Sequence, residues 1–158
     1  MPAIIFICTA NLCRSPMACA IFLHILSEMN ETGMWRVESA GVWGMDGNPA
    51  ARGCQQAVGK MGLDLSWHRA RTVSRELLQP FDLILTMEQG QKEALKWEFP
   101  ELSERIFLLS EMIGATSDVK DPIGGSMADF DNTAKEIERL IRQGFWQIKH
   151  IIQELKER

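Results

Sequence analysis

Strand-like and helix-like segments alternate along this chain, and the alternation restricts its fold more than any other feature. Residues 3–7 (AIIFI) are apolar throughout, which is typical of a strand buried on both faces. Three further strand-like runs follow at residues 36–40, 82–87 and 105–109. Strands that alternate with helices predict a parallel sheet covered by helices on both faces.

The helices are expected between these strands and at the end of the chain. Apolar residues at helical spacing predict a first helix over residues 15–28 and a last one from Asp129 onward. A second helix is expected from an Asn48 N-cap and Pro49 to about Met61, and a third after the strand at 82–87, ending at about Phe99. Residues 114–125 lose this periodicity and are rich in turn residues, which predicts a long surface loop.

Size and composition are those of one globular domain. The chain has 158 residues, of which 46% are hydrophobic and 24% charged, so we expect a single domain over residues 1–158. The chain begins directly with a strand-like run and has no apolar run of bilayer length, which favours a cytoplasmic protein. A net charge of −4 argues against nucleic acid or a membrane as its partner. The five tryptophans and nine methionines are expected mainly in the core.

The loop between the first strand and the first helix carries the chemistry. It reads Cys8-Thr9-Ala10-Asn11-Leu12-Cys13-Arg14-Ser15, without the glycines of a dinucleotide or Walker-type phosphate loop. A loop that wraps around a helix N-terminus aims its backbone N–H groups at one point, which suits a tetrahedral oxyanion. Arg14 can clamp two oxygens of that anion. Thiols at helix N-termini titrate at roughly 3.5 to 7.5, so we expect Cys8 to be an anionic nucleophile.

The Cys-x5-Arg pattern alone is weak, because four cysteines and many arginines produce it readily by chance. Its position after the first strand and before the Ser15-Pro16 helix start favours an anion site. The alternative is an ordinary turn between a strand and a helix.

Four motifs together resemble the low-molecular-weight protein tyrosine phosphatase family. They are the phosphate loop from Cys8 to Pro16, Ser39-Ala40-Gly41, His68-Arg69-Ala70-Arg71 and Asp121-Pro122, and they occur in the family's order over nearly the whole chain. The resemblance implies a doubly wound three-layer sandwich with a four-stranded parallel sheet and the phosphate loop between the first strand and first helix. It also implies hydrolysis of a phosphorylated protein through a phosphocysteine, with inorganic phosphate as product and without metal or cofactor.

The family pattern assigns catalysis to Cys8, Arg14 and Asp121, with Cys8 as nucleophile and Asp121 as general acid. Asp118 and Asp129 are competing carboxylates, and Asp121-Pro122 could also be a simple turn. The expected phosphate-binding and supporting residues are Thr9, Ala10, Asn11, Leu12, Cys13, Ser15, Ser39 and His68. We expect a left-handed backbone at Asn11, a negative φ at Ala10, and a proton from Ser15 to the Cys8 sulfur.

The remaining cysteines leave alternatives open. Cys13 is either a reversible disulfide partner of Cys8 or a small buried hydrophobic residue. Cys19 and Cys54 are interpreted as packing residues.

The two substrate markers disagree. Ile123-Gly124-Gly125-Ser126 lacks the aromatic residues of tyrosine-directed members and resembles the branch that includes protein arginine phosphatases, whereas the bulky Leu12 is the tyrosine-type feature. Trp43 or Met45 could supply an apolar wall for a phenyl ring. We expect a tyrosine phosphatase, with an arginine phosphatase as the alternative. An arsenate reductase would need further cysteines after Cys54, and a non-catalytic phosphate-binding module would not need both Cys8 and Asp121.

Overall fold

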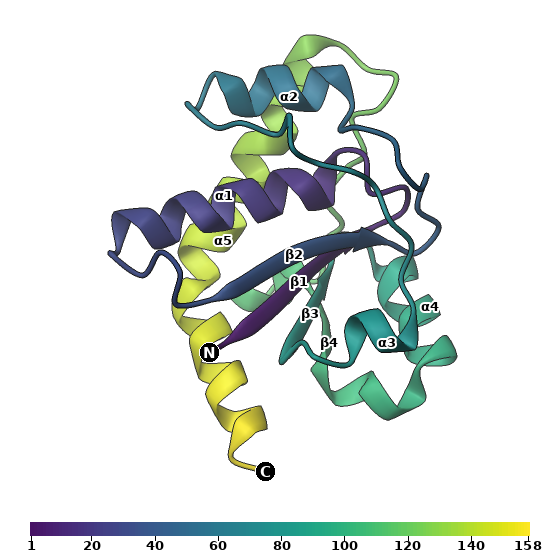
Figure 1. The fold of residues 1–158 in the computed structure, drawn as a ribbon, viewed down its shortest axis with the longest axis vertical. Helices are drawn as coiled ribbons and strands as arrows, with labels where there is room; N and C mark the ends of the chain where they lie inside the picture. Colours follow the sequence, from purple (N-terminus) through teal and green to yellow (C-terminus); the bar gives the residue numbers. More distant parts are fainter.

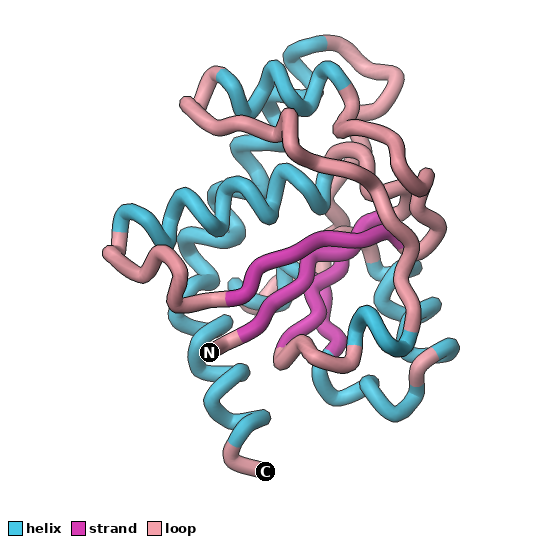
Figure 2. Tube along the Cα trace, in the orientation of Figure 1, coloured by secondary structure: helices cyan, strands magenta, loops and turns pink.

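The protein was examined as a computed structural model that describes residues 1–158, and it is a three-layer α/β sandwich. The sheet has four parallel strands in the order β2-β1-β3-β4, namely β2 (Arg36–Gly41), β1 (Ala3–Cys8), β3 (Leu83–Thr86) and β4 (Ile106–Leu108). Figures 1 and 2 show helices α1 (Arg14–Glu28), α2 (Arg52–Gly59) and α5 (Met127–Lys156) on one side of the sheet, and α3 (Arg75–Leu78) and α4 (Gln89–Glu98) on the other. The predicted fold class is confirmed.

The side chains of β1 point alternately into two hydrophobic cores. Ile4 and Phe6 belong to a cluster of 33 buried residues toward α1 and α5, while Ile5 and Ile7 belong to a cluster of 12 on the other face. All four are fully buried. The unbroken apolar run in the sequence therefore reflects a strand with a core on each side.

The strand register brings three strand ends to one edge of the sheet. Cys8 lies opposite Gly41 of β2, and Ile7 lies opposite Thr86 of β3. The loop after Cys8 therefore opens at the carboxyl edge, where parallel sheets of this kind bind their ligands.

Several predicted element boundaries need correction. Helix α2 begins at Arg52, not at an Asn48 N-cap, because Ala51 is not helical (φ −57°, ψ 143°) and the Asn48 carbonyl accepts the N–H of Ala70 at 2.8 Å and not one from a helix. The short helix α3 and a 3-10 helix at Pro100–Arg105 were not predicted, since each is only one or two turns long. Helix α5 starts at Met127, behind a capping box formed by Ser126 and Asp129.

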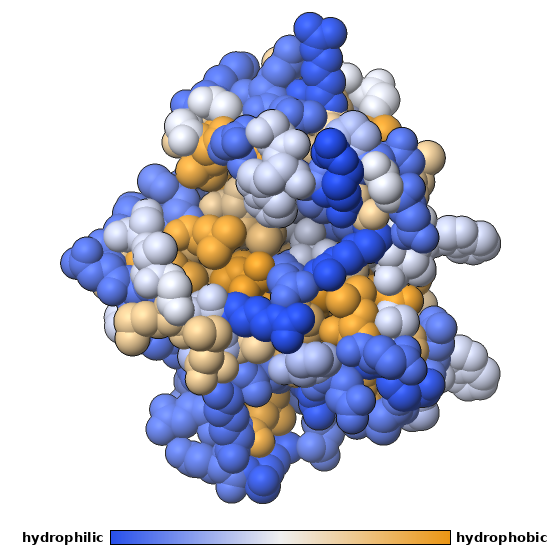
Figure 3. Space-filling model, in the orientation of Figure 1, coloured by the Kyte–Doolittle hydropathy of each residue, from blue (hydrophilic) through white to orange (hydrophobic).

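The tryptophans also differ from the prediction. Only Trp35 is buried, against Phe22 and Phe145, whereas Trp43, Trp67, Trp97 and Trp146 are exposed. Figure 3 shows one face of the molecule as largely hydrophilic, with hydrophobic residues gathered in separate patches. None of the helices has the length and apolar character needed to cross a membrane.

Candidate active site

The carbonyl groups of the loop from Cys8 to Leu12 all face away from the loop's centre. Each of these five carbonyls accepts a hydrogen bond from the segment between residues 42 and 68. The donors are the N–H groups of Val42 (2.9 Å), Trp43 (2.9 Å), Met45 (3.1 Å) and Ala51 (2.8 Å) and the ring of His68 (2.7 Å). A peptide unit that directs its carbonyl outward directs its N–H group the other way, so this segment orients the loop amides inward.

The amides of the same loop are unpaired within the protein. None of the backbone N–H groups of residues 9–15 donates a hydrogen bond to a protein acceptor. They converge before the N-terminus of α1, where the helix dipole adds a partial positive charge. Converging free amides at a helix N-terminus form a binding site for a phosphate-like anion.

Asn11 holds the loop in shape with both ends of its side chain. Its φ of +60° is the predicted left-handed conformation, and the residue is fully buried. The amide nitrogen donates to Ser15 Oγ at 2.8 Å and to Ser39 Oγ at 3.0 Å, and the amide oxygen accepts from the N–H of Arg71 at 3.0 Å. Ala10 keeps a negative φ, which is the condition under which alanine is acceptable at this position.

His68 and Gly41 support the loop from outside. His68 is buried, and burial lowers its pKa, an effect partly opposed by the hydrogen bond to the Asn11 carbonyl and reinforced by the charges of Arg71 and Arg69. A neutral ring that faces a carbonyl must carry its proton on Nε2 and donate it. Gly41 lies so close to the loop that a Cβ there would be 2.5 Å from the carbonyl oxygen of Thr9.

The Cys8 sulfur lies beside one hydroxyl group. Cys8 Sγ is 3.0 Å from Ser15 Oγ, and both residues are buried. Because Ser15 Oγ already accepts from Asn11, its own proton is free to point at the sulfur, and the alternative acceptor, the Ala40 carbonyl, is farther away at 3.4 Å. The hydroxyl can therefore stabilise a thiolate.

Arg14 is buried and held by three oxygen groups. Its guanidinium donates to the carbonyl of Val119 at 2.8 Å and lies 3.2 Å from the Glu88 carboxylate and 3.7 Å from that of Asp121. With its side chain only 3% exposed, Arg14 is oriented by the start of α4 and by the 114–125 loop together. Its planar fork is thereby preorganised for an oxyanion.

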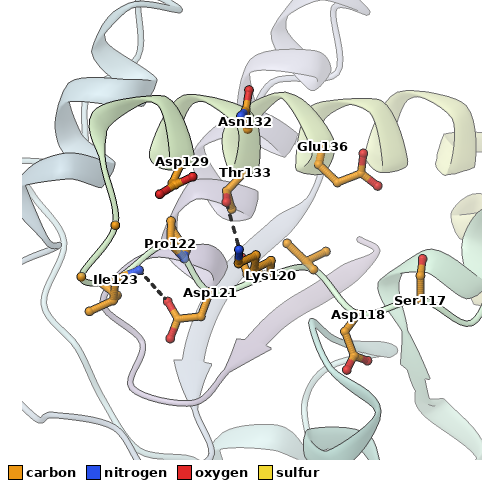
Figure 4. A pocket seen from close by; sticks show the side chains of 13 residues that line it. Ser117, Asp118, Lys120, Asp121, Pro122, Ile123, Asp129, Asn132, Thr133 and Glu136 are labelled. Carbon is orange, nitrogen blue, oxygen red and sulfur yellow. Dashed lines mark hydrogen bonds between the residues drawn. The ribbon is translucent and has the colours of Figure 1, made fainter.

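Among the three candidate carboxylates, only Asp121 lies near Arg14. Figure 4 shows its side chain pointing away from α5, and it accepts one bond, from the N–H of Ile123 at 3.0 Å. Asp118 caps α4 through Gln89 N–H at 2.8 Å, and Asp129 caps α5 through Ser126 N–H at 2.9 Å. The side chain of Asp121 is 49% exposed, so it can reach a ligand that enters from solvent.

Exposed apolar side chains lie in the segments around the loop. Trp43, Met45 and Ile123 are exposed, and Leu12 is half-buried. A cleft of about 470 Å³ next to the loop is lined in part by Thr9, Trp43, Glu88 and Gln91. The largest cleft, of about 740 Å³, lies between the 114–125 loop and α5 and does not include Cys8 (Figure 4).

The cysteines pair differently from the prediction. Cys13 forms a disulfide with Cys54, with Cα atoms 5.4 Å apart, while Cys8 and Cys19 are free. Cys54 and Cys13 are both buried in the larger core cluster, as the packing interpretation expected, but the disulfide between them was not predicted. The expected disulfide between Cys13 and Cys8 is not formed. The pair could not be predicted from the sequence, because the two cysteines are 41 positions apart along the chain.

Three contributing residues were not predicted from the sequence. Glu88 contacts Arg14, Gln91 donates to Thr9 Oγ1 at 3.0 Å, and Arg71 donates from Nε to the Ser39 carbonyl at 3.0 Å. Glu88 follows β3 at the same sheet edge as Cys8, and that position is the signal that could have identified it.

Known proteins share this sequence and fold over nearly the full length. A family model described as low molecular weight phosphotyrosine protein phosphatase matches residues 3–157. The protein-arginine-phosphatase of Bacillus subtilis is 35% identical over 92% of this chain and 96% of its own length. The low molecular weight protein-tyrosine-phosphatase Ptp of Acinetobacter johnsonii is 33% identical over 94% and 96%, respectively. A structure of the YwlE arginine phosphatase with a phosphorylated active site serine superimposes with a TM-score of 0.88 at 34% identity, covering 93% of this chain and 95% of that one.

Proposed function

This chain belongs to the low molecular weight phosphotyrosine protein phosphatase family, and from that premise we propose that it hydrolyses phosphotyrosine in proteins through a phosphocysteine on Cys8. The observation that carries the proposal is the ring of unpaired amides at residues 9–15, which surrounds the position where Cys8 and Arg14 meet a bound phosphoryl group. We propose further that residues 1–158 form one phosphatase domain.

In the first half-reaction, the Cys8 thiolate attacks phosphorus and the tyrosine oxygen leaves. The three equatorial oxygens carry the charge of the transition state, and the amides and the Arg14 guanidinium stabilise it there. Asp121 donates its proton to the leaving oxygen, a contribution that is typically worth on the order of 10² to 10⁴ in rate.

In the second half-reaction, water attacks the phosphocysteine. Asp121, now a carboxylate, accepts a proton from the water, and inorganic phosphate is released as the sulfur leaves. Ser15 donates a hydrogen bond to the departing thiolate across the 3.0 Å that separates the two atoms. In the YwlE arginine phosphatase structure with a phosphorylated active site serine, an active-site side chain likewise carries the phosphoryl group.

The surroundings of the site favour a phenyl ring as the leaving group. Leu12 offers an aliphatic surface in the phosphate loop, and Met45 and Ile123 are exposed apolar residues in the segments beside it. Apolar contact suits an aryl ester better than a guanidino group, whose nitrogens need polar partners.

One observation favours a second candidate, phosphoarginine. The loop at residues 114–125, called the acid loop below, carries no aromatic residue after Asp121-Pro122. In addition, one relative at 35% identity is a protein-arginine-phosphatase. The hydrolysis chemistry would be the same, with a guanidino nitrogen as the leaving atom.

The two candidates are separated by measuring kcat/KM on matched peptides that carry phosphotyrosine, phosphoserine or phosphoarginine. We expect phosphotyrosine to exceed phosphoarginine by at least tenfold, with phosphoserine the poorest. The Cys8→Ser variant is the blank, and we expect it to lose all turnover while unfolding at the same denaturant concentration as the wild type. Efficient phosphoarginine turnover with negligible phosphotyrosine turnover would reverse the assignment.

A further inference from the structure

The disulfide between Cys13 and Cys54 joins the phosphate loop to helix α2. Cys13 is the last loop residue before Arg14, and Cys54 is the third residue of α2. We propose that this bond is a redox-controlled cross-link that prevents the Cys13 thiol from reacting with oxidised Cys8. It thereby determines whether oxidation of the nucleophile is reversible. Its effect on activity rests on the proposed function, whereas the bond itself does not.

The geometry allows the bond to open and close without rebuilding the site. The Cα separation of 5.4 Å lies within the range that disulfides adopt, so the two backbones are already placed for it. One residue before Cys13, the Leu12 carbonyl accepts the N–H of Ala51 at 2.8 Å, which holds the same two segments together independently of the sulfurs. Helix α2 also packs against α1 and α5. After reduction, the two thiols therefore stay within reach of each other.

The cross-link forms by exchange with a low-molecular-weight disulfide such as oxidised glutathione. One thiolate attacks the glutathione disulfide and releases one glutathione, and the second thiolate then displaces the other. Two protein thiols are oxidised, one glutathione disulfide is reduced to two thiols, and no other oxidant is needed. Because both sulfurs are buried, exchange requires a transient movement of α2, and we expect it to take minutes to hours.

While the cross-link is closed, no other thiol of this chain can rescue Cys8, so in the absence of an added thiol its sulfenic acid has no reducing partner. Peroxide converts a thiolate to a sulfenic acid with release of hydroxide, and a neighbouring thiol can then condense with it to a disulfide and water. The only free thiol besides Cys8 is Cys19, whose Sγ donates to the Val37 carbonyl at 3.6 Å. Burial, with a smaller contribution from Glu38, raises the pKa of Cys19 to about 12, which keeps it protonated. A sulfenic acid on Cys8 then oxidises further and irreversibly.

When the cross-link is open, Cys13 becomes available. Cys8 and Cys13 lie at the two ends of the same short loop and are both buried in the same core cluster, so we expect the freed Cys13 thiol to condense with the Cys8 sulfenic acid to a disulfide that reductants reverse. The redox state of Cys54 thus decides whether oxidation of Cys8 is reversible.

The bond is tested by equilibrating the protein in buffers of graded reduced-to-oxidised glutathione ratio, alkylating free thiols and digesting with trypsin. Cleavage after Arg14, Arg52 and Lys60 gives a peptide 1–14 with Cys8 and Cys13 and a peptide 53–60 with Cys54. We expect these two peptides to be cross-linked under oxidising conditions and separate under reducing ones. The Cys8→Ser variant should give the same cross-link, which assigns it to Cys13.

Two variants complete the mapping. Cys54→Ala should abolish the cross-link, and Cys19→Ala, the matched buried cysteine, should leave it unchanged. If peptide 1–14 closes on itself as the main oxidised product, or if no cross-link to 53–60 forms at any ratio, the inference is overturned. A protein that forms the cross-link but hydrolyses no phosphopeptide would contradict the proposed function and leave the cross-link standing.

The consequence for Cys8 is measured by treating the enzyme with hydrogen peroxide and then with dithiothreitol. We expect the cross-linked wild type to recover at least fivefold less activity than the reduced wild type or Cys54→Ala, and Cys19→Ala to follow the wild type in both states. Equal recovery of the cross-linked and reduced forms would show that Cys13 is not the protecting thiol.

Discussion

The phosphate loop at residues 8–15 and the acid loop at residues 114–125 face the same site but are held very differently. In the phosphate loop, Asn11 and Ser15 are fully buried, and the carbonyls of residues 8–12 are all hydrogen-bonded. The acid loop is tied at Val119, whose N–H donates to the Met87 carbonyl at 2.8 Å, but Ile123 beyond it is 49% exposed. The phosphate loop is thus mostly buried and is hydrogen-bonded along its length, whereas the loop at residues 114–125 is buried at Val119 and Pro122 and exposes Asp121 and Ile123 beside them.

This difference matches what each loop has to do. A transferring phosphoryl group is stabilised by dipoles that are oriented before the reaction, because reorienting them during the reaction would cost free energy. The proposed proton donor, Asp121, instead has to meet leaving groups that enter from solvent, and its half-exposed side chain is suited to that role. The comparison predicts that changes in the acid loop affect the rate alone, whereas changes in the phosphate loop affect rate and stability together.

The largest expected effect comes from Asp121→Asn, which removes the acidic proton and keeps the shape. We expect kcat on an alkyl or phenyl phosphate with a poor leaving group to fall by about 10²-fold or more, and kcat on p-nitrophenyl phosphate to fall far less. The free energy of unfolding should stay within about 0.5 kcal/mol of the wild type. Asp118→Asn is the matched control, and an equal loss there, or equal losses on both substrates, would place the acid elsewhere.

The next largest effect is a loss of stability in Asn11→Ala. Asn30→Ala is the matched control, since both asparagines have a positive φ, of 60° and 57°. The left-handed backbone costs each alanine variant about 1 kcal/mol. Asn11→Ala also loses three hydrogen bonds, two of them buried and one partly buried, each worth about 1 kcal/mol, and should be destabilised by about 3 kcal/mol more. Urea unfolding measures this difference. Equal destabilisation would mean that the Asn11 side chain does not hold the loop.

The smallest effect is a pH dependence of stability carried by His68. Burial holds the pKa of His68 below its ordinary value of 6.5, so the unfolded chain binds a proton that the folded protein does not. Stability should therefore fall as the pH decreases through 6.5, and it should fall less steeply in His68→Gln. Urea unfolding at pH 7.5 and 5.5 measures the two slopes. The control variant His150→Gln, at an exposed position, should lose as much stability between pH 7.5 and 5.5 as the wild type. If His68→Gln also loses as much, the buried neutral ring of His68 is not the cause of the pH dependence.

The phosphate loop with Cys8 and Arg14 could be placed from the sequence because it lies between two short segments that have their own signals. The strand at residues 3–7 is apolar throughout, the helix after it begins at Ser15-Pro16, and Cys8 and Arg14 are fixed between them by chain connectivity. Asn11 was placed in a left-handed turn because its short amide side chain tolerates that conformation. The start of α2 was not predictable, since the Asn48 carbonyl pairs with the distant N–H of Ala70, a contact that the local helix signal at Asn48 does not reveal.

By itself, the sequence determined the α/β alternation, the loop with its nucleophile and arginine, and the family to which they belong. Only the tertiary structure decided which distant groups complete the site. Glu88 and Val119 orient Arg14, Arg71 and Ser39 bind Asn11, and Cys54 pairs with Cys13. The physical reason is that backbone periodicity and turn chemistry act over a few residues, whereas these contacts join segments brought together by packing against one sheet edge.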